Sequence, residues 1–443
     1  MGRCRAGAQA VVLGIALLSA NAVSAQSDAT RTFDEIKVLG NSRFTDQQII
    51  ETSGLLTGQP LDRSDLLAAV ESLEFTGEFE NIQIFEAGNS LVIEVIEEPQ
   101  ASGALTGTLG ADSDVGLIGS IGLRLNDTPV EGGSVTGRIS LAEEFQRARI
   151  GVDLPTFAFG RPGGADLFFA NEDFDENRFS YRTFGVEPYL VLQESAQSET
   201  RASLFAYSSD MFDVDGDASP ILQAEEGQED YVGLSLIHGR ESGSERGLST
   251  RLTLSQEVAF GSEDRSFATT SLSFSAKVPL GQSGLTLAST VTGAGVFALS
   301  GDGARAVDRF TLGGLSLRGF ERGTIGPRDV CDACDPGGTE VSERLGGEFF
   351  AVARTELQAP IAPERFGQLK GFVFADMGSA WGLDTDTAPL GSLENGFDLR
   401  ISGGVGLRWE TEIATVEVYY GEPIEKLDTD EEQQFGFAIR TPF

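Results

Sequence analysis

The chain has 443 residues, with 32 lysines and arginines against 68 aspartates and glutamates, which gives a formal net charge of −36. So acidic a chain is not expected to bind nucleic acid, because phosphate backbones attract clustered basic side chains. One histidine and three cysteines leave little material for a metal site, a cofactor or a histidine-based catalytic centre. Gly-x-Ser-x-Gly is absent and His238 lies in a strand-like run, so the protein is not expected to be an enzyme.

Residues 1–25 have the pattern of a secretory signal peptide. Arg3 and Arg5 precede an apolar core at 10–20, and Val23-Ser24-Ala25 offers a small-residue cleavage site. The apolar run is shorter than the roughly 20 residues that a membrane-spanning helix needs. We therefore expect an exported chain that crosses any membrane with strands.

Residues 26–100 are predicted to form a small α/β domain with the order β-α-α-β-β. Thr45 and Asp62 are good helix N-caps, and the turn at 87–89 favours a hairpin. The expected elements are a strand at 33–39, helices at 45–52 and 61–73, and strands at 79–85 and 91–96.

The opening of this domain, Ile36-Lys37-Val38-Leu39-Gly40-Asn41-Ser42-Arg43-Phe44, resembles that of a polypeptide-transport-associated (POTRA) domain. The resemblance implies a periplasmic domain that receives extended polypeptide by strand addition at an exposed sheet edge. A domain that acts only as a spacer or plug is the alternative.

Residues 101–443 lose the helical period and show segments of about ten residues that alternate apolar and polar side chains, the pattern of a transmembrane β-barrel. In 397–409, Val405 and Leu407 share one face, and Arg400 and Arg408 lie on the other, which must point into a lumen. The predicted strands, about sixteen in number as an even-stranded barrel requires, are 103–112, 115–125, 132–141, 145–154, 164–175, 178–193, 199–209, 230–240, 246–260, 264–278, 284–299, 346–358, 367–377, 396–409, 412–421 and 433–443. The fold class is therefore mainly β: a 16-stranded antiparallel transmembrane barrel after one small α/β domain.

Three long connections, at 210–229, 300–345 and 378–395, are expected to face the outside of the cell. They are rich in acidic side chains. Exposure of these connections to solvent is enough to explain that acidity. Bridging through divalent cations to lipopolysaccharide is the alternative.

The chain ends on alternating hydrophobic residues. Phe435, Phe437, Ile439 and the terminal Phe443 resemble the C-terminal signal by which outer-membrane barrels are recognised for insertion. A soluble β-sandwich could also alternate, but it would rarely combine this ending with a signal peptide and so many strands.

The glycine-rich stretch 313–323 contains Leu317-Arg318-Gly319-Phe320. These residues stand where the BamA/TamA family of outer-membrane proteins has its Val-Arg-Gly-Phe/Tyr motif, in the sixth extracellular loop, and the chain resembles this family along nearly its whole mature length. The resemblance implies that loop 300–345 folds back into the lumen and that Arg318 pairs with acids on the wall.

Two acids match positions of that family. Glu356 lies on the same strand face as Arg354, whereas Asp376 shares its face with Phe372 and Phe374, which leaves the direction of Asp376 open. An arginine shielded from solvent gains from bidentate carboxylates and is costly if left unpaired. We therefore expect an Arg318–Glu356–Asp376 cluster with a structural and gating role.

Cys331-Asp332-Ala333-Cys334 lies in the same loop. A zinc site would need two more ligands, and none is evident. In an exported loop a Cys331–Cys334 disulfide is the favoured interpretation, although so tight a ring could stay reduced.

The resemblance implies a bacterial outer-membrane factor that assembles or transports polypeptides. Its expected partners are unfolded outer-membrane or secreted clients, the lipid bilayer with lipopolysaccharide, and a periplasmic or inner-membrane-anchored protein. The first and last barrel strands would part to template incoming strands. Alternatives are a two-partner-secretion-type exporter of one protein, whose usual second periplasmic module and plug helix are not visible here, and a passive porin or structural barrel.

Overall fold

The computed structural model describes residues 30–97, 103–174, 178–195, 197–243, 247–262, 265–281, 284–301, 303–331, 341–362, 367–411 and 414–440. The predicted signal peptide lies outside these residues. Within them, no helix has the length and apolar character needed to span a membrane.

A small α/β domain comes first. Its elements are β1 (Arg31–Thr32), β2 (Glu35–Leu39), α1 (Asp46–Ser53), β3 (Pro60–Leu61), α2 (Arg63–Glu74), β4 (Phe79–Ala87) and β5 (Ser90–Glu97). The main sheet has the order β2-β5-β4, with β2 parallel and β4 antiparallel to the central β5. The short β1–β3 pair is an addition to the predicted order.

Local sequence explains both helices of this domain. Thr45 and Gln48 form a capping box at the start of α1, and Asp62 and Asp65 form another at the start of α2. Gly54 ends α1 with φ +70°, a left-handed conformation that glycine adopts without steric cost. The helices bury their apolar faces against the sheet, in a core that includes Phe33, Ile36, Val38, Ile49, Leu55, Ala69, Leu73, Leu91, Ile93 and Val95.

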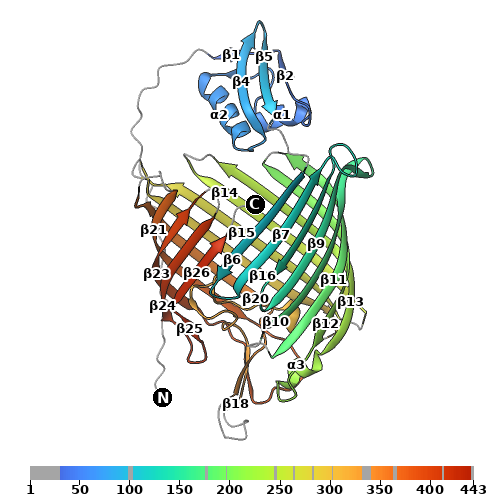
Figure 1. Ribbon diagram of the computed structural model, residues 1–443, viewed down its shortest axis with the longest axis vertical. Coiled ribbons are helices and arrows are strands. Elements are labelled where there is room, and N and C mark those ends of the chain that lie inside the picture. The colour runs from blue at the N-terminus through green and yellow to red at the C-terminus, as the bar shows by residue number, and fades with distance from the viewer. Residues whose placement is uncertain are drawn as a thin grey trace, which may run out of the picture.

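The rest of the chain forms a closed antiparallel barrel of sixteen strands, which confirms the predicted architecture. The strands are β6 (Gly103–Asp112), β7 (Gly116–Asn126), β8 (Ser134–Leu141), β9 (Phe145–Ala158), β10 (Arg161–Phe174), β11 (Phe179–Ser195), β12 (Ser198–Phe212), β13 (Gly227–Gly243), β14 (Ser249–Gly261), β15 (Ser266–Pro279), β16 (Thr286–Ser300), β20 (Phe349–Pro360), β21 (Gln368–Trp381), β23 (Arg400–Glu410), β24 (Thr415–Glu425) and β26 (Phe435–Arg440). The small domain lies over one mouth of the barrel, and α3 (Pro220–Ala224) and β18 (Arg328–Cys331) project from the opposite end (Figure 1).

The barrel wall follows the predicted alternation. On β23, Val405 and Leu407 are 55% and 46% exposed on the outer face, whereas Arg400 is 3% exposed on the inner face. The outer face therefore carries the apolar side chains and the inner face carries polar ones, as a barrel in lipid requires.

The three long connections meet at the end far from the small domain. β18 pairs with β19 (Val341–Arg344) and with β22 (Ser392–Glu394) in a small sheet. Residues of these connections and of α3 pack around Met211, Ile221, Leu222, Leu345 and Leu383. The 301–348 connection also contains the 3-10 turn η2 (Ala306–Asp308) and β17 (Gly319–Phe320).

Among the described residues, one junction of the wall is much shorter than the others. β26 pairs with β6 through two residue pairs, Ala438–Asp112 and Ile439–Ala111. The next shortest junction, between β24 and β26, has six. Within the described residues, the part of β6 from 103 to 110 has no pairing partner on the β26 side.

Candidate functional site

The glycine-rich stretch forms a compact tip inside the barrel. Leu312 and Ile325 exchange backbone hydrogen bonds at its base, and the amide of Gly314 donates to the carbonyl of Phe320 across it. Gly319 has φ +93°, and a Cβ there would lie 3.2 Å from the side chain of Ser402. The tip therefore needs glycine both for its backbone conformation and for its close approach to the wall.

Arg318 is fully buried and meets both predicted acids. Its Nε donates to Asp376 Oδ2 at 2.7 Å and its Nη2 to Asp376 Oδ1 at 2.8 Å. Its Nη1 donates to Glu356 Oε1 at 2.6 Å. The structure thus brings the three residues together, with a bidentate pair and a second carboxylate that fix the plane of the guanidinium.

Aromatic rings share the lumen face with Asp376. The Cζ of Arg318 lies 3.7 Å from the ring centroid of Phe374, and Phe372 and Tyr419 are within 6 Å. The sequence left the direction of Asp376 open because phenylalanines on its face suggested lipid. The structure turns that face inward, because a guanidinium covers the rings.

A second row of charged side chains, which the sequence did not predict, surrounds Arg318 and its two acids. Arg408 donates from Nη1 to Glu356 Oε2 at 3.1 Å and from Nε to Glu417 Oε2 at 2.9 Å. Arg354 donates to the carbonyl of Leu315 at 2.9 Å, and its Nε lies 4.0 Å from Asp376. The inward parity of Arg408 and Arg354 on their strands was the available signal.

The complete cluster is electrically balanced. Three arginines (318, 354 and 408) face three carboxylates (356, 376 and 417). Removal of charges from water is costly unless each finds a partner, so the network accommodates the loop arginine without a net buried charge. We call these six residues the latch.

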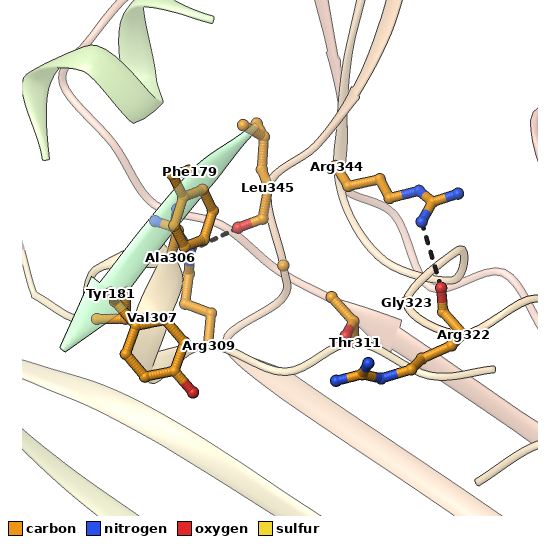
Figure 2. A pocket seen from close by; sticks show the side chains of 11 residues that line it. Phe179, Tyr181, Ala306, Val307, Arg309, Thr311, Arg322, Gly323, Arg344 and Leu345 are labelled. Carbon is orange, nitrogen blue, oxygen red and sulfur yellow. Dashed lines mark hydrogen bonds between the residues drawn. The ribbon is translucent and has the colours of Figure 1, made fainter. Parts of the chain in front are cut away.

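A cavity of about 170 Å³ lies between the 301–348 connection and β11, lined by Phe179, Tyr181, Arg309, Arg322, Arg344 and six further residues of the connection (Figure 2). Arg309 donates to the carbonyl of Leu345 at 2.9 Å and forms a bidentate pair with Glu225. Arg344 donates to the carbonyl of Arg322 and pairs with Glu431. These arginines already have partners, and their contacts hold the connections together around the cavity.

The remaining predicted residues lie apart from the latch. Leu317 and Phe320 are buried against Leu312, Ile325 and Val352. Cys331 is disulfide-bonded, and its predicted partner Cys334 lies outside the described residues. Phe435, Phe437 and Ile439 point outward from β26, and Phe443 lies outside the described residues.

No group of three or more histidine, cysteine, aspartate or glutamate side chains with metal-binding geometry occurs in the part of the chain that the structure describes. The one histidine, His238, lies on β13, where its Nδ1 is 2.9 Å from Thr200 Oγ1.

Comparison with known proteins gives consistent results. The outer membrane protein assembly factor BamA of Neorickettsia risticii is 26% identical over 432 residues, which cover 92% of this chain and 55% of that protein. BamA of Neisseria meningitidis serogroup B is 22% identical, with 93% and 56% covered. This chain therefore spans about half the length of both relatives.

Solved structures show the same fold. BamA of Haemophilus ducreyi lacking POTRA domains 1-3 superimposes with a TM-score of 0.66 at 20% identity, covering 93% of this chain and 84% of that one. CdiB of Acinetobacter baumannii gives 0.53 at 14% identity, with 93% and 74% covered.

The Omp85 superfamily domain matches residues 144–443. This range holds most of the barrel and the whole latch. The chain therefore belongs to the Omp85 superfamily, as a barrel of the BamA/TamA family.

Proposed function

We propose that this protein is an outer-membrane factor that assembles or inserts outer-membrane proteins or transports polypeptides. It opens its barrel at the β6–β26 seam to do so. The observation that carries the proposal is the brevity of that seam, which has two residue pairs among the described residues. Relatives named as outer membrane protein assembly factors support the same conclusion.

The seam offers a template for an incoming strand. An unpaired strand edge presents free backbone donors and acceptors that another extended chain can satisfy. The edge of β6 from 103 to 110 is such an edge within the described residues. A client hairpin pairing there would extend the wall at low cost, because few hydrogen bonds join β6 to β26 among the described residues.

The small domain would receive the client in the periplasm, as a POTRA domain. Its sheet order leaves β2 and β4 as edges, and the exposed apolar side chains on these strands include Leu39 and Phe85. An extended polypeptide could add to either edge by backbone hydrogen bonds, with these side chains contributing apolar contact. The domain lies over the barrel mouth at which β6 begins (Figure 1).

The latch would hold the loop in the lumen as a structural and gating element. The hydrogen bonds from Arg318, in the Leu317-Arg318-Gly319-Phe320 motif, to Glu356 on β20 and Asp376 on β21 support that role. A lumen filled in this way argues against a passive porin.

A two-partner-secretion-type exporter is the second candidate. The likeness to CdiB supports the fold alone and does not distinguish an exporter from an assembly factor. The two candidates differ in the number of clients, so one experiment separates them.

The test is to deplete the protein in its native host and to quantify the outer-membrane proteome. An assembly factor predicts a broad loss of barrel proteins, and an exporter predicts the loss of one secreted product. An unchanged proteome with unchanged secretion would contradict both and favour a porin. A catalogue of the affected proteins would also identify the clients.

A further inference from the structure

We propose that the latched loop is also a strap across the seam, and that Asp114 is the positioning residue that fastens it to the first-strand side. The strap is defined here as residues 312–325. The proposal rests on the proposed function in that it concerns the same seam, but it makes a separate claim: the far end of the seam is held shut by the loop more than by its own strand pairing.

On the last-strand side, the strap is paired by backbone to the connection that leads into β26. β17 pairs with β25 (Glu432–Gln433), through Gly319 with Gln433 and Phe320 with Glu432. The amide of Glu321 continues the ladder by donating to the carbonyl of Glu431 at 2.9 Å, and the amide of Glu431 donates to Thr324 Oγ1 at 2.9 Å. The strap therefore moves with the start of β26.

On the first-strand side, the strap is tied to the turn between β6 and β7. The amide of Leu315 donates to Asp114 Oδ2 at 2.8 Å. The neighbouring Gly314 has φ +57°, and a Cβ there would lie 2.2 Å from the same carboxylate oxygen. Only a glycine lets the backbone approach Asp114 so closely.

A second tie lies one turn further along the wall. Arg322 Nη1 donates to Glu144 Oε2 at 2.6 Å, and Glu144 lies in the connection between β8 and β9. The strap thus reaches two turns on one side of the seam and one connection on the other.

Within the part of the chain that the structure describes, the seam itself has few hydrogen bonds at this end. Beyond its two residue pairs, the amide of Ser113 donates to the carbonyl of Phe437 at 3.1 Å, and Gln433 Nε2 donates to the carbonyl of Ser113 at 3.1 Å. Gln433 is itself a residue of β25, so this last contact depends on the strap-bound connection. Separation of β6 from β26 at the far end therefore requires the Asp114–Leu315 bond to break.

The latch keeps the strap in place, so that the Asp114–Leu315 hydrogen bond resists opening of the seam. Arg318 fixes the strap to β20 and β21, so the strap cannot simply follow β6 when the seam parts. The seam is then free to open from the end near the small domain, where 103–110 of β6 have no partner on the β26 side within the described residues, and is hinged at the far end by Asp114.

Hydrogen exchange of the full-length protein in membranes tests this. Asp114→Ala should raise the exchange of β26 amides (435–440) about fivefold, the equivalent of one lost hydrogen bond, and leave the β7–β8 junction unchanged. Gly314→Ala should give the same pattern, because the added methyl displaces the strap from Asp114. Asp114→Asn, which keeps an acceptor oxygen, should lie near the parent protein.

Two control variants test whether the change in exchange is specific to the strap and the seam. Ser195→Ala removes a side-chain oxygen that accepts the Ser198 amide at 3.0 Å in a turn far from the strap, and it should leave β26 exchange unchanged. A cross-seam disulfide between Ala111→Cys and Ile439→Cys, which are facing residues, should cancel the effect of Asp114→Ala.

Unchanged β26 exchange in both Asp114→Ala and Gly314→Ala would overturn the proposal, as would an equal rise at the β7–β8 junction. The measurement needs no client. Its outcome therefore does not depend on whether depletion alters the outer-membrane proteome. A failure of the strap proposal can thus be distinguished from a failure of the proposed function.

Discussion

Arg318 and Asp376 face each other through two parallel hydrogen bonds, of 2.7 and 2.8 Å, with both side chains fully buried. One residue comes from the middle of a long loop and the other from a wall strand, 58 positions later. A buried ion pair adds little net stability over an apolar replacement, but removal of one partner leaves an uncompensated charge. The pair therefore makes the docked position of the loop specific.

Substitution of one partner should destabilise the barrel strongly. We expect Asp376→Ala to lower the free energy of unfolding by about 3–5 kcal/mol, because Arg318 stays buried without its bidentate carboxylate. Heat-induced loss of the compact gel band in detergent measures this. Arg251→Ala, which removes an exposed pair with Glu241, is the control and should change stability by less than about 1 kcal/mol.

The double variant Arg318→Met, Asp376→Leu should be less destabilised than the sum of the two single changes, because neither charge is left alone. Strict additivity would contradict a direct coupling of the two residues.

Loss of the ring under the guanidinium should have a smaller effect. Phe374→Leu removes the face that lies 3.7 Å from Arg318, and a buried cation–π contact is worth about 2 kcal/mol. Phe168→Leu, whose ring lies 5.9 Å from the Cζ of Arg149, is the matched control. The same thermal assay should rank Phe374→Leu as the less stable variant, and the reverse order would refute the stacking role.

The Arg309–Glu225 pair should control how firmly two far-end connections hold together. Glu225 accepts both guanidinium bonds of Arg309, at 2.8 and 3.0 Å, and the Ala306 amide at 2.7 Å. Glu225→Ala leaves Arg309 buried without a carboxylate, so the connections should separate. Limited proteolysis of intact cells should cut the 213–226 connection about ten times faster, since loss of roughly 1.4 kcal/mol of closure gives a tenfold change in opening. Equal cleavage in the parent protein and the variant would show that the pair does not fasten these connections.

Glu97 should make the small domain sensitive to acid. Burial raises the pKa of its carboxyl, but hydrogen bonds from the Ser42 hydroxyl and from the amides of Ser42, Arg43 and Phe44 outweigh burial and lower the pKa from an ordinary 4.5 to about 2. A depressed pKa in the folded state means that the stabilisation is complete above pH 4.5 and is lost as the pH falls toward 2. The contribution is on the order of 3 kcal/mol.

Hydrogen exchange of 42–44, corrected for its intrinsic pH dependence, should therefore rise between pH 4.5 and pH 2. Glu97→Gln should show fast exchange of these amides already at pH 7 and should flatten the pH response. A variant that keeps the full acid sensitivity would place its origin at another carboxylate.

The strand pattern was predictable because it is a local property. Alternation along 397–409 is enforced by lipid on one side and a polar lumen on the other, so each strand carries its own signal. Residues such as Phe374 broke the pattern, because an aromatic side chain can face the lumen when a guanidinium covers it. The helix caps of the small domain were predictable for the same local reason.

The sequence was enough to predict an exported barrel, its sixteen strands, and the candidate set of Arg318, Glu356 and Asp376. The tertiary structure was needed to show that Arg354, Arg408 and Glu417 complete the latch. It was also needed to show that Asp114 accepts the Leu315 amide and that Gln433 donates to the carbonyl of Ser113 across the seam. These contacts join residues up to 320 positions apart. They depend on which residues face each other when the sheet closes into a barrel. The local alternation of apolar and polar residues does not specify that register.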